Sequence, residues 1–346
     1  MKTMITIASR QVWPQVICVK KIAPQKIYLL HSRNEEESHG PALRLSEFMT
    51  KNHLCADVYL HEAPDNDPLC FAKTFEALLS GIKNSDEVTV NITGGNKLMT
   101  ISMYNQAVKK RMKIVYLERN KELFYFLPPD YLENPKKEDM DTSITNDLDP
   151  LELLKCQLGG SYVNNDGECL VLSNEGKMQN LEEINVKLAK SVSFADANIP
   201  YENYLVRTDG ERVRREEGKT ARFGSHMEYI VAFVLLKLGI PRVYRGAMLA
   251  PLNLHGAIEG ELDLVFNHRG RLWLVDCKDK KKSSEGINEI RRSMIQSIET
   301  GGILAKTIYV RTKLIPDNVN AYAKSRGVET VYKNNLFNGL KEILMR

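Results

Sequence analysis

The stretch VNITGGNKLM, residues 90–99, decides how the first part of the chain is expected to fold. It leads from an apolar run at residues 88–92, through a turn with two glycines, into a helical pattern at residues 98–108. Because alternating strands and helices bury parallel strands between two helical layers, we expect a doubly wound α/β sheet over roughly the first 120 residues. The other apolar runs of this region, with helical patterns between most of them, are residues 4–7, 27–30, 58–60 and 114–117.

Polar residues at the ends of these predicted strands indicate an anion-binding site. A glycine turn that opens a helix leaves backbone N–H groups free for phosphate, and open α/β sheets bind ligands beyond the carboxyl ends of their strands. The alternative is a tight turn that needs glycine only for its geometry. Neither the GxGxxG pattern of dinucleotide-binding folds nor the P-loop pattern is present. Trp13 either stacks on a base or is a core or interface aromatic. The candidate ligand residues are Ser9, Arg10, Gln11, Trp13, Ser32, Arg33, Thr93, Gly94, Gly95, Asn96 and Lys97.

Composition limits the classes of protein that fit. A length of 346 residues allows two domains, and a net charge of +4 permits nucleic-acid contact without demanding it. The six cysteines form no CxxC pair, which predicts reduced thiols rather than disulfides or a zinc site. The N-terminus does not resemble a signal peptide, and no apolar run is long enough to cross a bilayer. We therefore expect a cytoplasmic protein without a membrane partner.

The sequence predicts a second α/β domain after a linker. Residues 131–152 are acidic and polar and contain two prolines. We expect residues 1–135 to form the first domain, residues 136–220 to link or bridge, and residues 221–346 to form the second domain. Periodicity within the second domain predicts helices at residues 226–238, 285–299 and 335–345, and strands at residues 242–249, 261–266, 272–277 and 305–311, with a hairpin turn at 267–270.

Two pairs of charged residues are expected to meet on this predicted hairpin. Glu261 and Asp263 share one face of the first strand, and Asp276 and Lys278 share one face of the second. Asp276 follows the apolar run 272–275, where an unpaired carboxylate is energetically costly. Carboxylate oxygens suit Mg²⁺ or Mn²⁺, and such an ion activates water and polarises a phosphoryl group. Because a nearby lysine can orient the water or neutralise developing charge, the cluster indicates phosphodiester hydrolysis.

Bland interpretations compete with this one. Asp276 and Lys278 could form a surface ion pair, with Glu261 as a flanking charge. Basic residues near the cluster are candidates for contacts with backbone phosphates, although interleaved acidic residues also fit a solvated face. These basic residues are Arg207, Arg212, Arg214, Arg215, Lys219, Arg222, the lysines at 280–282, Arg291 and Arg292.

The sequence ELD at residues 261–263, followed by DCK at residues 276–278, resembles the signature of the PD-(D/E)xK nucleases. The resemblance implies a restriction-endonuclease-like α/β domain. Its catalytic residues would be Glu228, Asp263, Asp276 and Lys278, and its metal ligands Asp263, Asp276 and Glu228. Glu228 stands in the run GSHMEYIVAFVLL, where Ser225 and Glu228 equally fit a capping box. The chain departs from the commonest signature in having Asp before x-Lys and no proline directly before Asp263.

The run VNITGGNKLM, together with IYLLHS at residues 27–32, resembles the CARF domains of type III CRISPR ancillary proteins. With the nuclease motif behind it, the whole chain resembles the cyclic-oligoadenylate-activated CARF nucleases of the Card and Can type. The resemblance implies a homodimer that binds cyclic tetra-adenylate across its two-fold axis and then cleaves DNA, RNA or both with Mn²⁺ or Mg²⁺. Asn96 is a small departure, because family members typically carry Thr or a similar residue there.

Two other functions stay open from the sequence. One is a ligand-sensing regulator that binds nucleic acid without cutting it, although the intact Asp–x–Lys pattern argues against it. The other is a DNA repair or junction nuclease that needs no ligand. Metal-dependent cleavage separates the proposed nuclease from the first, and a response to cyclic tetra-adenylate separates it from the second.

Overall fold

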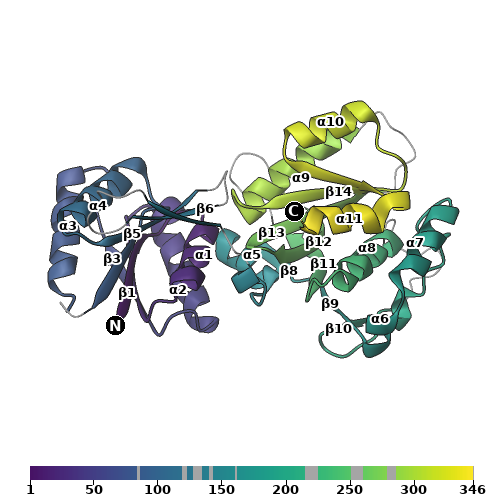
Figure 1. The fold of residues 1–346 in the computed structure, drawn as a ribbon, viewed down its shortest axis with the longest axis horizontal. Coiled ribbons are helices and arrows are strands. Elements are labelled where there is room, and N and C mark those ends of the chain that lie inside the picture. The colour runs from purple at the N-terminus through teal and green to yellow at the C-terminus, as the bar shows by residue number, and fades with distance from the viewer. Residues whose placement is uncertain are drawn as a thin grey trace. The chain divides into compact units, whose positions relative to one another are not determined.

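The chain folds into two compact units, Met1–Leu148 and Asp149–Arg346, and each is built around its own sheet (Figure 1). No helix in the described part of the chain is long and apolar enough to cross a membrane. The computed structural model describes residues 1–83, 86–118, 123–127, 135–139, 143–159, 162–214, 225–250, 260–278 and 286–345.

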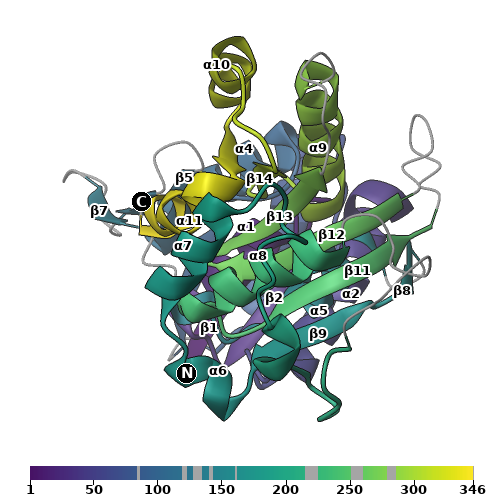
Figure 2. The same cartoon turned by 90° about the vertical axis from the view of Figure 1, so that its right-hand side faces the viewer.

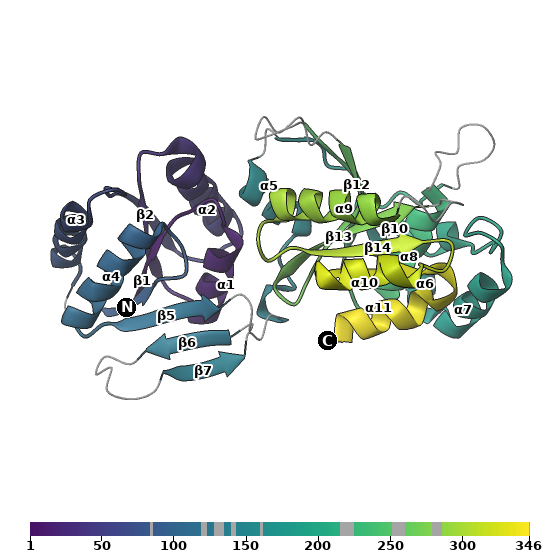
Figure 3. The ribbon, with the colours of Figure 1, turned by 90° about the horizontal axis from the view of Figure 1, so that it is seen from above.

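The first unit has a doubly wound sheet, as the alternation of strands and helices predicted. Its five parallel strands continue into an antiparallel hairpin that the sequence did not predict. Figure 3 shows α1 and α2 on one side of the strands and α3 and α4 on the other. The sheet order is β3 (Asp57–Glu62), β2 (Lys26–His31), β1 (Lys2–Ile7), β4 (Glu87–Asn91), β5 (Lys113–Glu118), β6 (Leu123–Leu127) and β7 (Lys136–Asp139). The helices are α1 (Trp13–Ile22), α2 (Gly40–Lys51), α3 (Pro68–Ser80) and α4 (Lys97–Lys109).

The order of the strands reverses between β1 and β4. In open α/β sheets this switch point leaves a crevice at the carboxyl ends of the two strands, because their helices cover opposite faces. The crevice lies beside the glycine turn that links β4 to α4. Asn96 caps α4 by accepting a hydrogen bond from the backbone N–H of Met99, and its Nδ2 donates to the carbonyl of Asp65 at 2.8 Å.

The two glycines of this turn each meet a steric requirement. A Cβ on Gly94 would lie 2.5 Å from the carbonyl oxygen of Ile7 and 2.0 Å from Nε2 of Gln15. Gly95 has φ +88°, a left-handed conformation that a larger residue adopts only with strain. The glycines thus let the turn pass against the end of β1, which accounts for their presence whether or not a ligand binds.

The second unit contains a mixed sheet of eight strands (Figure 2). Antiparallel pairs join β10, β9, β11, β12 and β13, whereas β13, β14 and β15 run parallel. The order is β10 (Leu205–Arg207), β9 (Glu168–Leu172), β11 (Val243–Leu249), β12 (Gly260–His268), β13 (Arg271–Lys278), β14 (Lys306–Arg311) and β15 (Val328–Tyr332), with β8 (Val163–Asn165) beside β11. The helices are α5 (Pro150–Leu158), α6 (Asn174–Met178), α7 (Leu181–Lys190), α8 (Ser225–Lys237), α9 (Gly286–Gly301), α10 (Asp317–Ser325) and α11 (Leu336–Met345).

The segment expected to link the domains, residues 136–220, is divided between the two units. Its first four residues form β7 at the edge of the first sheet. The stretch from α5 to β10 belongs to the second unit, where β9 pairs with β11. The limits 1–135 and 221–346 for the two functional domains therefore remain a proposal. Along the chain, the boundary between the two compact units falls after residue 148.

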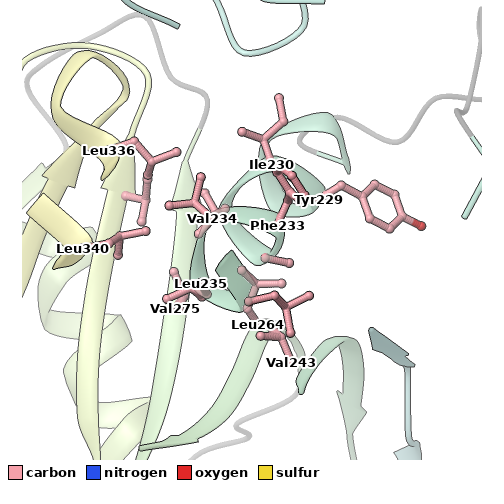
Figure 4. Packing of buried hydrophobic residues seen from close by; sticks show 14 of the residues in the cluster. Tyr229, Ile230, Phe233, Val234, Leu235, Val243, Leu264, Val275, Leu336 and Leu340 are labelled. Carbon is pink, nitrogen blue, oxygen red and sulfur yellow. The ribbon is translucent and has the colours of Figure 1, made fainter. Parts of the chain in front are cut away.

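The two faces of the second sheet differ in character. On one face α8 packs against alternate residues of the central strands, among them Leu264 and Val275 (Figure 4). The intervening residues point to the opposite face, because side chains alternate along a strand. There α9 and α10 form a separate cluster around Tyr309. This alternation places Asp263 and Asp276 on the side of α9.

Replacing Gly94 with Ala is expected to destabilise the first unit by about 1–3 kcal/mol, because the added methyl clashes with backbone and side chain. Urea unfolding followed by the fluorescence of Trp13, in a Trp273→Phe background, reports this unit separately. Gly81→Ala is the matched control, since its Cβ would meet only the carbonyl of Leu78 at 3.4 Å. Equal midpoints for the two variants would contradict the steric explanation.

Candidate catalytic cavity and candidate ligand pocket

A tight hairpin brings the predicted acidic residues together. Arg269 and Gly270 both have positive φ, +49° and +66°, as a two-residue type I′ turn requires. The turn fixes the register in which Leu264 of β12 pairs with Val275 of β13. One residue further along, Asp263 and Asp276 are neighbours on the face that α9 covers. The hairpin and the shared face that the sequence predicted are confirmed.

Lys278 lies between the two carboxylates. Its Nζ contacts Oδ1 of Asp276 and lies 3.7 Å from Oδ2 of Asp263. The backbone N–H of Cys277 donates to the same Asp263 oxygen at 2.7 Å. Ser293 on α9 donates to Oδ2 of Asp276. The cluster is therefore a half-buried, hydrogen-bonded group, in which the ion pair between Asp276 and Lys278 that was the alternative is also present.

Burial and mutual repulsion perturb the protonation of this cluster. Burial raises the pKa of Asp263 to about 7, Lys278 opposes the rise, and Asp276 and Glu228 add to it. Burial on its own would lower the pKa of Lys278, but the carboxylates of Asp276 and Asp263 raise it above its ordinary value. Lys278 is accordingly charged at neutral pH, and an additional cation beside Asp263 would favour its ionised form.

A cavity of about 420 Å³ opens beside the cluster. Its walls come from the start of β12, the end of β13, one residue of β14 and one side of α9. Four α9 residues at helical spacing reach it, and the sequence analysis named only one of them, Arg292, among the basic residues. The lining residues are Gly260, Glu261, Leu262, Asp263, Leu274, Val275, Asp276, Lys278, Glu289, Arg292, Ser293, Gln296 and Thr307.

The donor set of the cavity fits a hard divalent cation. Among the described residues no group of three or more His, Cys, Asp or Glu side chains converges on one point. Mg²⁺ sites commonly use one or two carboxylates and take their remaining ligands from water and substrate phosphate. Asp263 and Asp276 supply such a pair of carboxylates. The adjacent cavity leaves space for water and for a phosphate.

Glu228, the further metal ligand that the resemblance implies, forms an ion pair with an arginine of the neighbouring strand. Its Oε2 lies 2.8 Å from Nε of Arg245 on β11. Arg245 pairs with Leu264 across the ladder, so both side chains face α8. Nη1 of Arg245 also donates to Glu168 at 3.2 Å and to the hydroxyl of Tyr229 at 3.1 Å. Glu228 does not line the cavity, and it acts on Asp263 through its charge. The capping-box alternative involves Ser225, whose side chain lies outside the described residues.

A second cavity, of about 550 Å³, lies at the switch point of the first sheet. Six of the predicted ligand residues line it: Ser9, Arg10, Gln11, Ser32, Gly95 and Asn96. Its other lining residues were not predicted, because they come from helices and from three loops whose positions depend on the fold: Ala8, Asn34, Glu37, Ser38, Asp65 and Met99. We call this cavity the switch-point pocket.

The remaining predicted ligand residues lie elsewhere. Trp13 is 4% exposed within α1, so its ring belongs to the core. Arg33 is largely exposed and pairs with Glu62 at 2.6 Å. The hydroxyl of Thr93 accepts the backbone N–H of Leu117 at 2.9 Å, which ties the turn to β5. Neither Gly94 nor Lys97 lines the pocket.

The arginines and lysines predicted to contact phosphates have different surroundings. Arg212 and Arg214 are exposed, and Arg291 donates a hydrogen bond to the hydroxyl of Tyr322. Arg207 pairs with Asp209 at 2.7 Å and with Glu211 at 3.4 Å, as the solvated-face interpretation expected. Arg292 lines the cavity beside Asp263 and Asp276. Several others lie outside the described residues: Arg215, Lys219, Arg222 and the lysines at 280–282.

The strand order, the switch-point pocket and the mixed second sheet define a two-part α/β protein whose first part is Rossmann-like. Residues 3–146 match the family described as the Card1 CARF domain, so the first unit is a CARF domain. No curated protein sequence matches the chain.

Solved structures share the fold of the whole chain. Protein VC1899 from Vibrio cholerae aligns over 99% of this chain and 98% of its own, with 13% identity and a TM-score of 0.70. Can2 from Sulfobacillus thermosulfidooxidans, solved in complex with cyclic tetra-adenylate, aligns over 98% and 96%, with 13% identity and a TM-score of 0.65. A type III CRISPR defence DNA nuclease activated by cyclic oligoadenylate aligns over 90% of this chain and 45% of its own, with 19% identity and a TM-score of 0.55. At these identities the likeness establishes the fold.

Glu37→Gln is expected to strengthen the binding of an anionic ligand in the switch-point pocket. Arg10 lies 3.7 Å from Glu37, so this carboxylate competes with a phosphate for the guanidinium. An exposed pair of this kind is worth up to about 1 kcal/mol, which corresponds to a fall in Kd of at most about fivefold. Calorimetric titration with cyclic tetra-adenylate measures the change. Glu36→Gln, which leaves the pocket lining intact, should keep the wild-type Kd, and an unchanged Kd in Glu37→Gln would contradict the competition.

Ser293→Ala is expected to weaken metal binding without unfolding the second unit. The hydroxyl of Ser293 fixes the orientation of Asp276, and loss of such a partner typically lowers metal affinity about 10–100-fold. Titration of Mn²⁺ into the full-length protein, followed by electron paramagnetic resonance of the free ion, measures the affinity. Ser325→Ala, at the end of α10, is the control. Equal Mn²⁺ affinity in wild type and Ser293→Ala would show that this hydrogen bond does not support a metal site.

Proposed function

We propose that the chain is a metal-dependent endonuclease of type III CRISPR defence that cyclic tetra-adenylate activates through its CARF domain. The observation that carries the proposal is the half-buried group of Asp263, Asp276 and Lys278 beside a cavity of about 420 Å³. Its position at the end of a strand hairpin supports the PD-(D/E)xK interpretation. The substrate is DNA, RNA or both.

Each residue of the group has a distinct role in this proposal. Asp263 and Asp276 hold Mn²⁺ or Mg²⁺, which when bound lowers the pKa of water and polarises the phosphoryl group. Lys278, held in place by both carboxylates, orients the attacking water and neutralises charge that develops on the phosphate. Glu228 stands outside the metal ligands and, with Arg245, adjusts the charge around Asp263. Cys277 contributes only its backbone N–H.

The proposal for the ligand rests on the switch-point pocket. It lies where Rossmann-like folds bind nucleotides, and it presents Arg10, Gln11, Ser9 and Ser32 beside the amino end of α4. Can2, which shares the fold, was solved with cyclic tetra-adenylate bound. We infer that this chain binds the same kind of ring.

The same reasoning favours a homodimer. A ring with two-fold symmetry suits a two-fold interface between identical subunits. Near the amino ends of α3 and α4 three large apolar side chains are exposed, as expected where a second copy packs: Leu69 at 76%, Leu98 at 46% and Ile101 at 57%. The ring would activate the nuclease to the extent that it binds the active arrangement of the dimer more tightly.

Asp276→Asn is expected to lower cleavage more than about 100-fold, beyond the loss typical of residues that only support a ligand. Full-length protein is incubated with plasmid, single-stranded DNA and RNA, with Mn²⁺ or Mg²⁺, with and without cyclic tetra-adenylate. Wild type should cut at least one substrate only when metal and ring are both present. Asp276→Asn should still bind the ring with wild-type affinity.

Asp317→Asn, an exposed carboxylate on α10, is the control and should cut like wild type. Cleavage by Asp276→Asn at the wild-type rate would refute the catalytic assignment. Binding of nucleic acid without cleavage under any condition would support a regulator instead, and cleavage that ignores the ring would support a ligand-independent nuclease.

A further inference from the structure

Helix α9 presents different residues to the sheet, to α10 and to the catalytic cavity. Ser293 is buried against the sheet and bonds to Asp276. The Nε of Arg291 donates to the hydroxyl of Tyr322 on α10 at 3.4 Å, so this side chain points away from the cavity. Its neighbour Arg292 lines the cavity. Two adjacent arginines of one helix therefore have different surroundings.

Arg292 is a positively charged residue in a cavity wall that contains several carboxylates. Four carboxylates line the cavity, those of Glu261, Asp263, Asp276 and Glu289. A nucleic acid carries a negative charge on every phosphate, and like charges repel it from such a wall. Among the described residues, the cations that line the cavity are Lys278 and Arg292. Their positive charges can attract an entering phosphate.

Lys278 and Arg292 differ in the ion pairs that they form with carboxylates of the protein. Lys278 contacts both Asp263 and Asp276. Within the described part of the chain, no carboxylate forms an ion pair with Arg292. Arg292 is exposed to solvent, and its guanidinium presents a planar set of donors. This geometry matches the oxygens of a phosphate in a bidentate contact.

Gln296 extends the same side of the helix by one turn. It lines the cavity, and its Nε2 lies 3.8 Å from the position that a Cβ would take on Gly260, at the start of β12. Residues four apart lie above one another on a helix, so Gln296 and Arg292 form a continuous polar edge. A strand that follows this edge would pass from the start of β12 toward Asp276 and Lys278.

We propose that Arg292 binds a backbone phosphate of the substrate in the catalytic cavity, with Gln296 as a neutral donor on the same edge. The proposal rests on the proposed nuclease function and names the residue that holds the substrate there. Arg292 recognises the charge of the phosphate and not the identity of the base, because a phosphate contact is the same for every nucleotide sequence. Arg291 has no part in substrate binding.

The test compares Arg292→Gln with Arg291→Gln in the full-length protein. Fluorescence anisotropy measures binding of labelled duplex and single-stranded DNA and RNA, with cyclic tetra-adenylate present and with EDTA so that nothing is cut. Arg292→Gln should bind about tenfold or more weakly at low salt, as expected for loss of a charged hydrogen bond. Its slope of log K against log salt should be shallower by about 0.9 for duplex or 0.7 for single strands. Arg291→Gln should match wild type in affinity and slope.

The outcomes separate this inference from the proposed function. Wild-type affinity and slope in Arg292→Gln would overturn the role of Arg292, while the loss of cleavage in Asp276→Asn would still support the nuclease. A loss confined to one base sequence would also overturn it, because it would indicate contact with a base. Wild-type protein that binds none of the labelled strands would overturn both.

Discussion

The organisation of the second unit depends on keeping two carboxylates and an ammonium together on one face of a hairpin. Two half-buried aspartates repel each other, and this repulsion adds to the effect of partial burial in raising the pKa of Asp263 to about 7. Lys278 and the N–H of Cys277 counter the repulsion on the strand side, and Ser293 holds Asp276 from α9. The arrangement is stable because the alternate residues of β12 and β13 pack against α8 and anchor the same strands. One face of the hairpin thus supplies packing, and the other supplies the chemistry.

In the first unit, the residues of the candidate site are brought together by backbone geometry and not by attraction between charges. Gly94 and Gly95 let the turn after β4 lie against the end of β1, and the polar residues after β1 and β2 then gather at the same edge. Three residues with formal charges line the switch-point pocket, Arg10, Glu37 and Asp65, and Arg10 lies 3.7 Å from Glu37. A multiply charged ring would have to displace the contact between Arg10 and Glu37, so the strength of that contact sets a threshold for binding.

The sequence predicted most of the elements that build the two sites, because α8 and the central strands are apolar runs of helix or strand length. It missed β7, whose sequence KKED has no apolar residue to mark a strand, and the hairpin that carries it. It placed Asp263, Asp276 and Lys278 together correctly, since a hairpin and an alternation of two fix that geometry. It did not indicate that Glu228 pairs with Arg245, because the contacts of a helix end depend on its packing against β11. The wall from α9 was missed for the same reason, although the spacing of Glu289, Arg292, Ser293 and Gln296 marks one side of a helix.

The most direct test of this account is an anomalous-scattering map from crystals of the full-length protein grown with Mn²⁺. The account predicts a manganese peak in direct contact with carboxylate oxygens of both Asp263 and Asp276, with Lys278 adjacent and Glu228 still paired with Arg245. Manganese bound elsewhere in the second unit, or its absence from these two carboxylates at saturating concentration, would contradict the claim that they form a metal site.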